Sequence, residues 1–249
     1  MSVLEVRGLH KSFGAIDVIN NIDLKVLPGE RHAIIGPNGS GKTTLFNLVT
    51  GWIRPSGGDI LINGELQHLL TPQRVTNKGF ARSFQRNLLL EGLSVFENLR
   101  LAVQAQHPSR RNFLVSTKRF REVHEQAEIA GQLMNLTAVL SRAVNQLSYG
   151  EKRQLEVAIA LCSRPKILLL DEPAAGTSPE ERARLVALIK DLPKTMTLLL
   201  VEHDMDVVFG VADNITVLSQ GRIIASGSPQ SIRDNAVVRE AYLGRRHHA

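Results

Sequence analysis

The residues with the clearest chemistry lie between positions 36 and 44, here called the phosphate loop. The segment Gly36-Pro-Asn-Gly-Ser-Gly-Lys-Thr43 matches the pattern G-x-x-x-x-G-K-[ST]. Glycines let a backbone wrap closely around phosphate groups, and successive N–H groups at a helix N-terminus favour an anion. A lysine neutralises phosphate charge, and a threonine hydroxyl can bind Mg²⁺. The predicted phosphate-binding residues are Gly36, Pro37, Asn38, Gly39, Ser40, Gly41, Lys42, Thr43 and Thr44, with Thr43 also a candidate Mg²⁺ ligand.

Two carboxylates follow an aliphatic segment later in the chain. Ile167-Leu-Leu-Leu170 is followed at once by Asp171 and Glu172. Ligands bind at strand ends in a parallel α/β core, so Asp171 is predicted to hold Mg²⁺ through water and Glu172 to polarise an attacking water. The alternative is that the two residues form an acidic cap on a helix that begins near Pro173.

The phosphate loop needs a strand before it and a helix after it, and the sequence indicates both. Arg31–Ile35 is predicted to be a short buried strand that runs into the loop, and Lys42–Val49 has helical spacing that ends at Gly51. Earlier residues alternate as strands do, and turn formers separate them. These strand positions are Leu4, Val6, Ile22, Leu24 and Val26, with turns at Gly14 and Pro28-Gly29.

The spacing of the apolar residues in the later part of the chain changes from a helical pattern to short strand-like runs. Residues 93–143 show helical periodicity with many charges, including the stretch 119–140, and predict an inserted helical subdomain. Apolar segments then predict a parallel α/β core that ends in a hairpin. Its expected strands are 166–170, Thr197–Val201, 215–218 and 223–225, with a helix at 179–190.

Composition limits the class of protein. The chain has 249 residues, of which 43% are apolar and 22% charged, as expected for one globular domain or one domain with an insertion. No apolar run approaches the roughly 20 residues that cross a bilayer, and the N-terminus lacks a signal-peptide layout. The single cysteine, Cys162, is expected to be a small buried residue. These features favour the cytosol.

The net charge of +6 is compatible with nucleic acid, anionic lipid or simple solubility. The densest basic stretch has too few aromatic residues to predict a base-stacking surface. We interpret it as a solvated face formed by Arg110, Arg111, Lys118, Arg119 and Arg121.

A third motif links these segments to a known family. Leu147-Ser-Tyr-Gly-Glu-Lys-Arg-Gln154, here called the signature segment, lies about 20 residues before Asp171. Ser148 and the N–H of Gly150 are predicted at a helix start, which favours an anion. The alternative for this segment taken alone is that Ser148 is an ordinary helix N-cap and binds no ligand. In this order of motifs the segment resembles the signature sequence of ATP-binding-cassette proteins, which binds the γ-phosphate of ATP held by the opposite subunit.

Three further positions match the pattern of that family. Gln85, in Arg82-Ser-Phe-Gln, resembles the glutamine that contacts Mg²⁺ and the attacking water; the alternative is a surface glutamine. His203 resembles the histidine that contacts the γ-phosphate; the alternative is a histidine with only a structural role. Phe13 resembles the aromatic residue that stacks on adenine; the alternative is a phenylalanine buried in the core.

Two positions depart from the family pattern. Tyr149 stands where the signature sequence has glycine, which questions close backbone approach at that residue. Ser178 stands where the loop between Pro173 and Pro179 has aspartate. Without that charge, the coupling between the two nucleotide sites is expected to differ.

Within the family the chain resembles the G-type (LivG-like) ATPase subunits of branched-chain amino acid importers, relatives of which serve amides and urea. The resemblance rests on Leu45-Phe-Asn-Leu-Val-Thr-Gly51, Arg82-Ser-Phe-Gln85, Val95-Phe-Glu-Asn-Leu99, Glu172-Pro-Ala-Ala-Gly176, Ile232-Arg-Asp-Asn235 and Ala241-Tyr-Leu-Gly244.

The resemblance implies an α/β fold of the P-loop NTPase class, with a RecA-like parallel-sheet core, an N-terminal antiparallel β subdomain and an inserted helical subdomain. The expected division of the chain is a core of residues 1–85 and 166–240, a helical subdomain of about 86–165 and a tail of 241–249. ATP and Mg²⁺ are the implied cofactors. The implied partners are a second ATPase subunit, alike or different, two transmembrane permease subunits and, indirectly, a periplasmic solute-binding protein. The implied location is the cytoplasmic face of the inner membrane.

Two alternative functions are compatible with an ATP-binding cassette. An ATPase of a lipid or lipopolysaccharide exporter would have nearly the same motifs. A soluble cassette protein acting on nucleic acid usually has two cassettes, long coiled coils or zinc-binding cysteines. This chain has one cassette, one cysteine and no sustained heptad run, so we expect no nucleic-acid partner.

Overall fold

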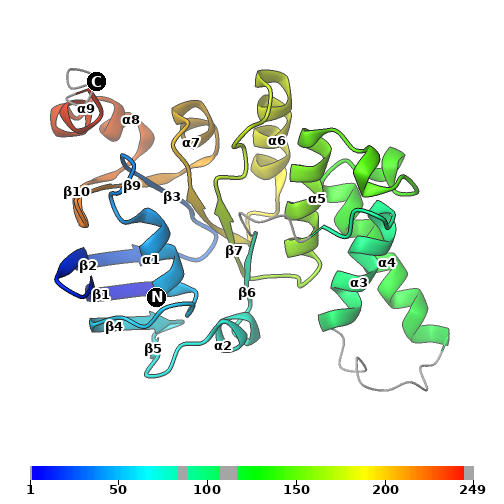
Figure 1. Cartoon of the computed structure of the whole chain (residues 1–249), viewed down its shortest axis with the longest axis horizontal. Coiled ribbons are helices and arrows are strands. Elements are labelled where there is room, and N and C mark those ends of the chain that lie inside the picture. Colours follow the sequence, from blue (N-terminus) through cyan, green and yellow to red (C-terminus); the bar gives the residue numbers. More distant parts are fainter. Residues whose placement is uncertain (1, 84–88, 107–116, 244–249) are drawn as a thin grey trace. The chain divides into compact units, whose positions relative to one another are not determined.

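Figure 1 shows the computed structural model of the chain, which describes residues 2–83, 89–106 and 117–243. The chain divides into two compact units: Met1–Phe80 with Lys194–Ala249, and Ala81–Pro193. Gln85, Arg110, Arg111 and residues 245–249 lie outside the described residues, so the expectations for them stay predictions.

The first unit begins with an antiparallel sheet. Its strands, in spatial order, are β2 (Ile16–Val26), β1 (Leu4–Phe13), β4 (Gly57–Ile62) and β5 (Glu65–Leu66). Leu4 pairs with Val26, and both side chains are buried, as the alternating pattern predicts. Sequence reasoning did not identify β4, which opens with Gly57 and Gly58, because glycine is a weak strand former.

A second, mainly parallel sheet contains the strand that leads into the phosphate loop. Within the first unit its order is β10 (Arg222–Gly227), β9 (Asn214–Ser219), β3 (Arg31–Ile35) and β8 (Thr197–Val201). β3 runs parallel to both neighbours, and β10 pairs antiparallel with β9. Every residue of β3 and β8 is buried, as expected for parallel strands. The predicted α/β class, these strands and the closing hairpin are confirmed.

The helices of this unit are α1 (Lys42–Val49), α2 (Pro72–Asn77), α7 (Met205–Val211), α8 (Pro229–Arg233) and α9 (Ala236–Leu243). α1 has the predicted bounds, and it buries Leu45, Phe46, Leu48 and Val49. α8 and α9 contact β10. The segment expected as a tail from residue 241 therefore begins inside α9.

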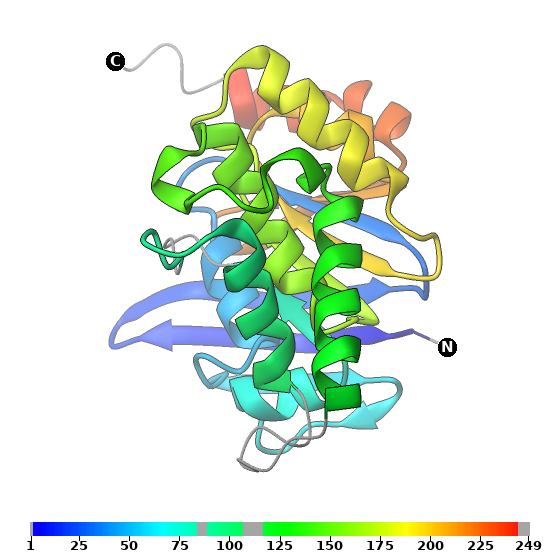
Figure 2. The same cartoon turned by 90° about the vertical axis from the view of Figure 1, so that its right-hand side faces the viewer.

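The second unit is mostly helical. It contains β6 (Phe80–Arg82) from Ala81 onward, β7 (Ile167–Asp171), α3 (Val95–Gln106), α4 (Thr117–Leu133), α5 (Tyr149–Leu161), α6 (Pro179–Asp191) and short 3₁₀ turns at Thr137–Val139 and Val144–Gln146. α3 contacts both α4 and α5, and Figure 2 shows α3 and α4 side by side. Among the helices that the structure describes, none has both the length and the apolar content to cross a bilayer.

The helix expected over residues 119–140 is shorter than its sequence pattern. α4 ends at Leu133 because Asn135 has a left-handed φ of 54°, which a continuing α-helix cannot contain. The apolar residues beyond this point still face inward: Leu136 is fully buried and its N–H donates to the Gly131 carbonyl. The periodicity therefore identified buried positions correctly but not the end of the helix.

Cys162 gives a chemical test of packing in the second unit. It follows α5, is buried, and its Sγ lies 3.7 Å from the Leu99 carbonyl oxygen. Burial raises the pKa of the thiol to about 12. Because only the thiolate is nucleophilic, we expect iodoacetamide at pH 8 to leave the native protein unmodified and to alkylate the urea-unfolded chain. Mass spectrometry reads out the result, and rapid alkylation of the native protein would contradict this packing.

Candidate functional site

The backbone of the phosphate loop requires glycine at defined positions. Gly39 and Gly41 have φ values of 77° and 103°, in the left-handed region that other residues rarely adopt. A Cβ on Gly41 would also lie 2.9 Å from the Val18 carbonyl oxygen, and one on Gly36 would lie 2.2 Å from that of Leu218. The loop therefore combines an unusual backbone with close approach of neighbouring strands.

The turn between β9 and β10 supports this loop. The Gly221 N–H donates to the Ser40 carbonyl at 3.0 Å, and the Gly221 carbonyl accepts from the Asn20 N–H at 2.8 Å. Gly221 has φ 73°, and a Cβ there would lie 2.4 Å from the Val18 carbonyl oxygen. Sequence reasoning placed Gly221 only in the connection between the predicted hairpin strands 215–218 and 223–225, because hydrogen bonds between distant backbones leave no local signal.

The side chains of the phosphate loop present positive charge and hydroxyl groups. Lys42 Nζ donates to the carbonyls of Gly36 at 2.8 Å and Pro37 at 3.1 Å, which holds the ammonium group over the loop. Thr43 is exposed and Thr44 is half-buried. Within the described part of the chain, no side chain caps the N-terminus of α1. The backbone N–H groups of the first turn of a helix point toward its N-terminus, which here is the phosphate loop. This direction is the one that favours binding of an anion in the loop.

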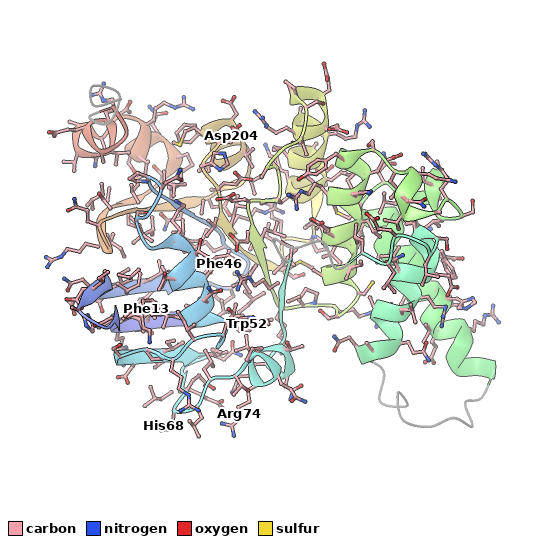
Figure 3. The ribbon with its side chains drawn as sticks, in the orientation of Figure 1. Phe13, Phe46, Trp52, His68, Arg74 and Asp204 are labelled. Carbon is pink, nitrogen blue, oxygen red and sulfur yellow. The ribbon has the colours of Figure 1, made fainter. Side chains whose placement is uncertain are left out.

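Phe13 and His203 also belong to the first unit. Phe13 ends β1 with 49% of its surface exposed, and the Lys11 ammonium lies 4.9 Å from its ring centroid. Figure 3 shows Phe13 at the end of the antiparallel sheet. His203 follows β8 and the buried Glu202; its side chain is 57% exposed, and its N–H donates to Glu202 Oε2 at 3.1 Å.

The acidic pair belongs to the second unit. Asp171 is the last residue of β7, and its Oδ2 accepts from Arg82 Nη2 at 2.8 Å. The side chain of Asp171 is fully buried, and that of Arg82 is 11% exposed. Asp171 Oδ1 is also buried, with no hydrogen-bond partner among the residues that the structure describes. A buried carboxylate oxygen without a donor is suited to a cation or its water shell.

Glu172 has an uncommon backbone. Its φ of 48° lies in the left-handed region, which a non-glycine residue seldom adopts. The Ala175 N–H donates to the Glu172 carbonyl at 3.1 Å and closes a turn here. Strain of this kind is common at functional sites.

The Arg82–Asp171 pair, which sequence reasoning did not identify, predicts a stability effect. Arg82→Met would leave the Asp171 carboxylate buried without its cation, so we expect a loss of about 3 kcal/mol in the free energy of unfolding in urea. Arg121→Met is the matched control: Arg121 and Glu125 are 83% and 59% exposed, and we expect a loss of at most about 0.5 kcal/mol. Equal losses in both variants would contradict a structural role for the buried pair.

The signature segment starts α5. Ser148 is the N-cap: its Oγ accepts from the Glu151 N–H at 3.1 Å, while Glu151 Oε2 accepts from the Ser148 N–H at 2.7 Å. Ser148 is therefore the ordinary N-cap that its alternative reading predicted, and this role leaves its hydroxyl hydrogen available to an acceptor. That acceptor is Glu181 Oε1 at 3.2 Å, which also accepts from the Gly150 N–H at 3.0 Å.

The two departures from the family pattern have structural roles. The ring of Tyr149 lies against Gly176, where an added Cβ would be 3.1 Å from ring atoms, and its hydroxyl accepts from Arg153 Nη2 at 2.6 Å. Ser178 is the N-cap of α6 and forms a capping box with Glu181.

The predicted site residues fall into two groups. Phe13, the phosphate loop and His203 belong to the first unit, whereas Ser148, Gly150, Asp171 and Glu172 belong to the second. Gln85 lies outside the described residues. Within each unit the predicted residues lie at the ends of strands, in the loops that follow them, or in the first turns of helices.

Two family models match the sequence. One, described as ABC transporter, matches residues 19–175, and the other, described as branched-chain amino acid ATP-binding cassette transporter, matches residues 222–248. The second match covers β10, α8 and α9, outside the segment that carries the nucleotide motifs.

Individual proteins agree with these matches. The chain is 42% identical to the high-affinity branched-chain amino acid transport ATP-binding protein BraF of Pseudomonas aeruginosa, over 97% of this chain and 98% of that protein. It is 40% identical to LivG of Escherichia coli K12, a protein of the same description, with the same coverage. Among solved structures, the ADP conformation of MJ1267, an ATP-binding cassette of an ABC transporter, superposes with a TM-score of 0.86 at 28% identity, over 98% of this chain and 99% of that one.

Proposed function

Because this chain belongs to the ABC transporter family, we propose that it is the ATP-hydrolysing subunit of an importer for branched-chain amino acids. The observation that carries the choice of substrate is the match of residues 222–248 to the branched-chain amino acid family model, because this segment lies outside the generic nucleotide motifs. It favours an importer over a lipid or lipopolysaccharide exporter. Amides and urea are the related solutes to test next.

Nucleotide binding falls to residues of the first unit in this proposal. The N–H groups of the phosphate loop and the Lys42 ammonium bind the phosphates of ATP. Phe13 stacks on adenine, which its exposed ring permits, and His203 contacts the γ-phosphate. The loop backbone supports this assignment, because glycine stands where a Cβ would collide with the carbonyl oxygen of Val18 or Leu218.

Hydrolysis falls mainly to residues of the second unit. Glu172 accepts a proton from the attacking water, whose oxygen forms a bond to the γ-phosphorus while the bond to ADP breaks. Asp171, Thr43 and Gln85 would hold Mg²⁺. The buried Asp171 Oδ1, which has no hydrogen-bond donor among the described residues, fits such an ion. When bound, Mg²⁺ would neutralise charge on the phosphates.

The proposed assembly supplies the remaining partners. Two cassettes close head to tail over two ATP molecules, so that each phosphate loop faces Ser148 and Gly150 of the other subunit. The second cassette is a copy of this chain or a similar ATPase. Two permease subunits carry the solute across the inner membrane, with the cassettes on its cytoplasmic face, and a periplasmic binding protein delivers it. In each cassette, residues 1–85 and 166–240 form the core and 86–165 the helical subdomain, with a tail at 241–249.

Affinity purification from detergent-solubilised native membranes tests this assembly. We expect mass spectrometry to identify two polytopic membrane proteins and a cassette subunit, together with ATPase activity in the same sample. Recovery of ribosomes or DNA-repair factors instead would contradict the transport function and leave only the ATPase assignment.

A further inference from the structure

The carboxylate of Glu181 joins the first turns of two helices in the second unit. Its Oε1 accepts from the Gly150 N–H at 3.0 Å and from Ser148 Oγ at 3.2 Å, both in the signature segment at the start of α5. Its Oε2 accepts from the Ser178 N–H at 3.1 Å at the start of α6. One side chain thus engages three donors on two elements.

This contact is close, and its acceptor is charged. A Cβ on Gly150 would lie 2.5 Å from Glu181 Oε1, so the carboxylate covers the face of the glycine. The N–H groups of Ser178 and Gly150 lower the pKa of Glu181, so the side chain is charged at neutral pH. The signature segment therefore already holds an anion, supplied by its own chain.

We propose that Glu181 competes with ATP for the signature segment: its carboxylate occupies the Ser148 and Gly150 donors in the open subunit and leaves them when the γ-phosphate held by the partner cassette arrives. This inference rests on the proposed function, which assigns that γ-phosphate to the same two donors. The Gly150 N–H is a single donor, and two anions at one donor repel each other. Closure of the cassettes therefore requires Glu181 to move.

The two oxygens of the Glu181 carboxylate have separate partners, which allows one to move while the other stays bound. Its Oε2 belongs to the capping box of α6, which needs only one side-chain oxygen, so Oε1 can leave the signature donors while α6 stays capped. A glutamine can do the same, because Gln also serves in a capping box. Its neutral amide binds the signature donors less strongly than a carboxylate does.

The test is the ATP dependence of hydrolysis by the complete transporter complex carrying Glu181→Gln. We expect the KM for ATP to fall by about fivefold, the lower end of typical coupling between sites, with kcat changed far less. Glu180→Gln is the matched control: Glu180 lies one residue earlier on the same turn of α6, is exposed and has no contact with the signature segment among the described residues. We expect its KM to equal that of the wild type.

Each other outcome has a defined meaning. An unchanged or raised KM in Glu181→Gln, or the same fall in KM for Glu180→Gln, would overturn the inference and leave the proposed function intact. Loss of folding in Glu181→Gln, judged by thermal unfolding beside the control, would also overturn it, because Glu181 would then serve only α6. Absence of ATP hydrolysis in the wild-type complex would instead reject the proposed function itself.

Discussion

Glu172→Gln is expected to retain ATP binding and to reduce the rate of hydrolysis by about 10²- to 10⁴-fold, the range typical of a lost general base. The glutamine amide has nearly the shape of the carboxylate but cannot accept a proton from water. The left-handed backbone at Glu172 constrains both side chains alike. Equilibrium binding of a fluorescent ATP analogue and the release of phosphate measure the two properties separately.

The same neutral change at Glu180 provides the control, since that side chain is exposed in the first turn of α6, where it accepts from Ser178 Oγ at 3.3 Å. We expect Glu180→Gln to hydrolyse ATP at the wild-type rate. Wild-type hydrolysis by Glu172→Gln would refute the assignment of Glu172 as the base.

Lys42→Ala is expected to weaken ATP binding by about 10- to 150-fold, the equivalent of one charge-assisted hydrogen bond of about 1.5–3 kcal/mol. The ammonium group is held over the loop by the carbonyls of Gly36 and Pro37, so it is pre-positioned for a phosphate. Isothermal titration calorimetry with ATP measures the change in Kd.

Lys25→Ala is the control for lost positive charge, because Lys25 lies on β2 with 68% of its side chain exposed. We expect its Kd for ATP to match the wild type. Equal Kd values for Lys42→Ala and the wild type would show that the phosphate loop does not bind the nucleotide through Lys42.

Sequence reasoning succeeded where the cause was local. β8 consists mostly of aliphatic residues, and such a run is typical of a strand that is buried on both faces. β3 begins with Arg31 and His32, and its prediction came from its place directly before the phosphate loop. The phosphate loop was predicted from its glycines, which its backbone geometry requires. The division into a core of residues 1–85 and 166–240 and a helical subdomain stays a prediction; the two compact units divide the chain after Phe80 and before Lys194.

The features that sequence reasoning missed depend on residues far apart in the chain. Arg82 pairs with Asp171 across 89 positions, and Glu181 reaches Gly150 across 31. Neither pairing has a period or a spacing from which it could be predicted. Gly221 supports the phosphate loop for the same reason, through backbone groups that every residue carries.

Ser178 shows how a departure can preserve one property of a motif. The family pattern has aspartate at this position, and serine and aspartate are both favoured N-caps. Here Ser178 caps α6 through its hydroxyl, so the helix starts where the pattern requires. Only the charge of the aspartate is lost.

Uptake of radiolabelled leucine by proteoliposomes tests whether this chain drives the import of branched-chain amino acids. The vesicles contain the complete complex with ATP on the side of this chain and the binding protein on the other. We expect uptake that requires ATP, that is inhibited by unlabelled isoleucine and valine, and that is abolished by Glu172→Gln. ATP hydrolysis without uptake of any branched-chain amino acid would contradict it.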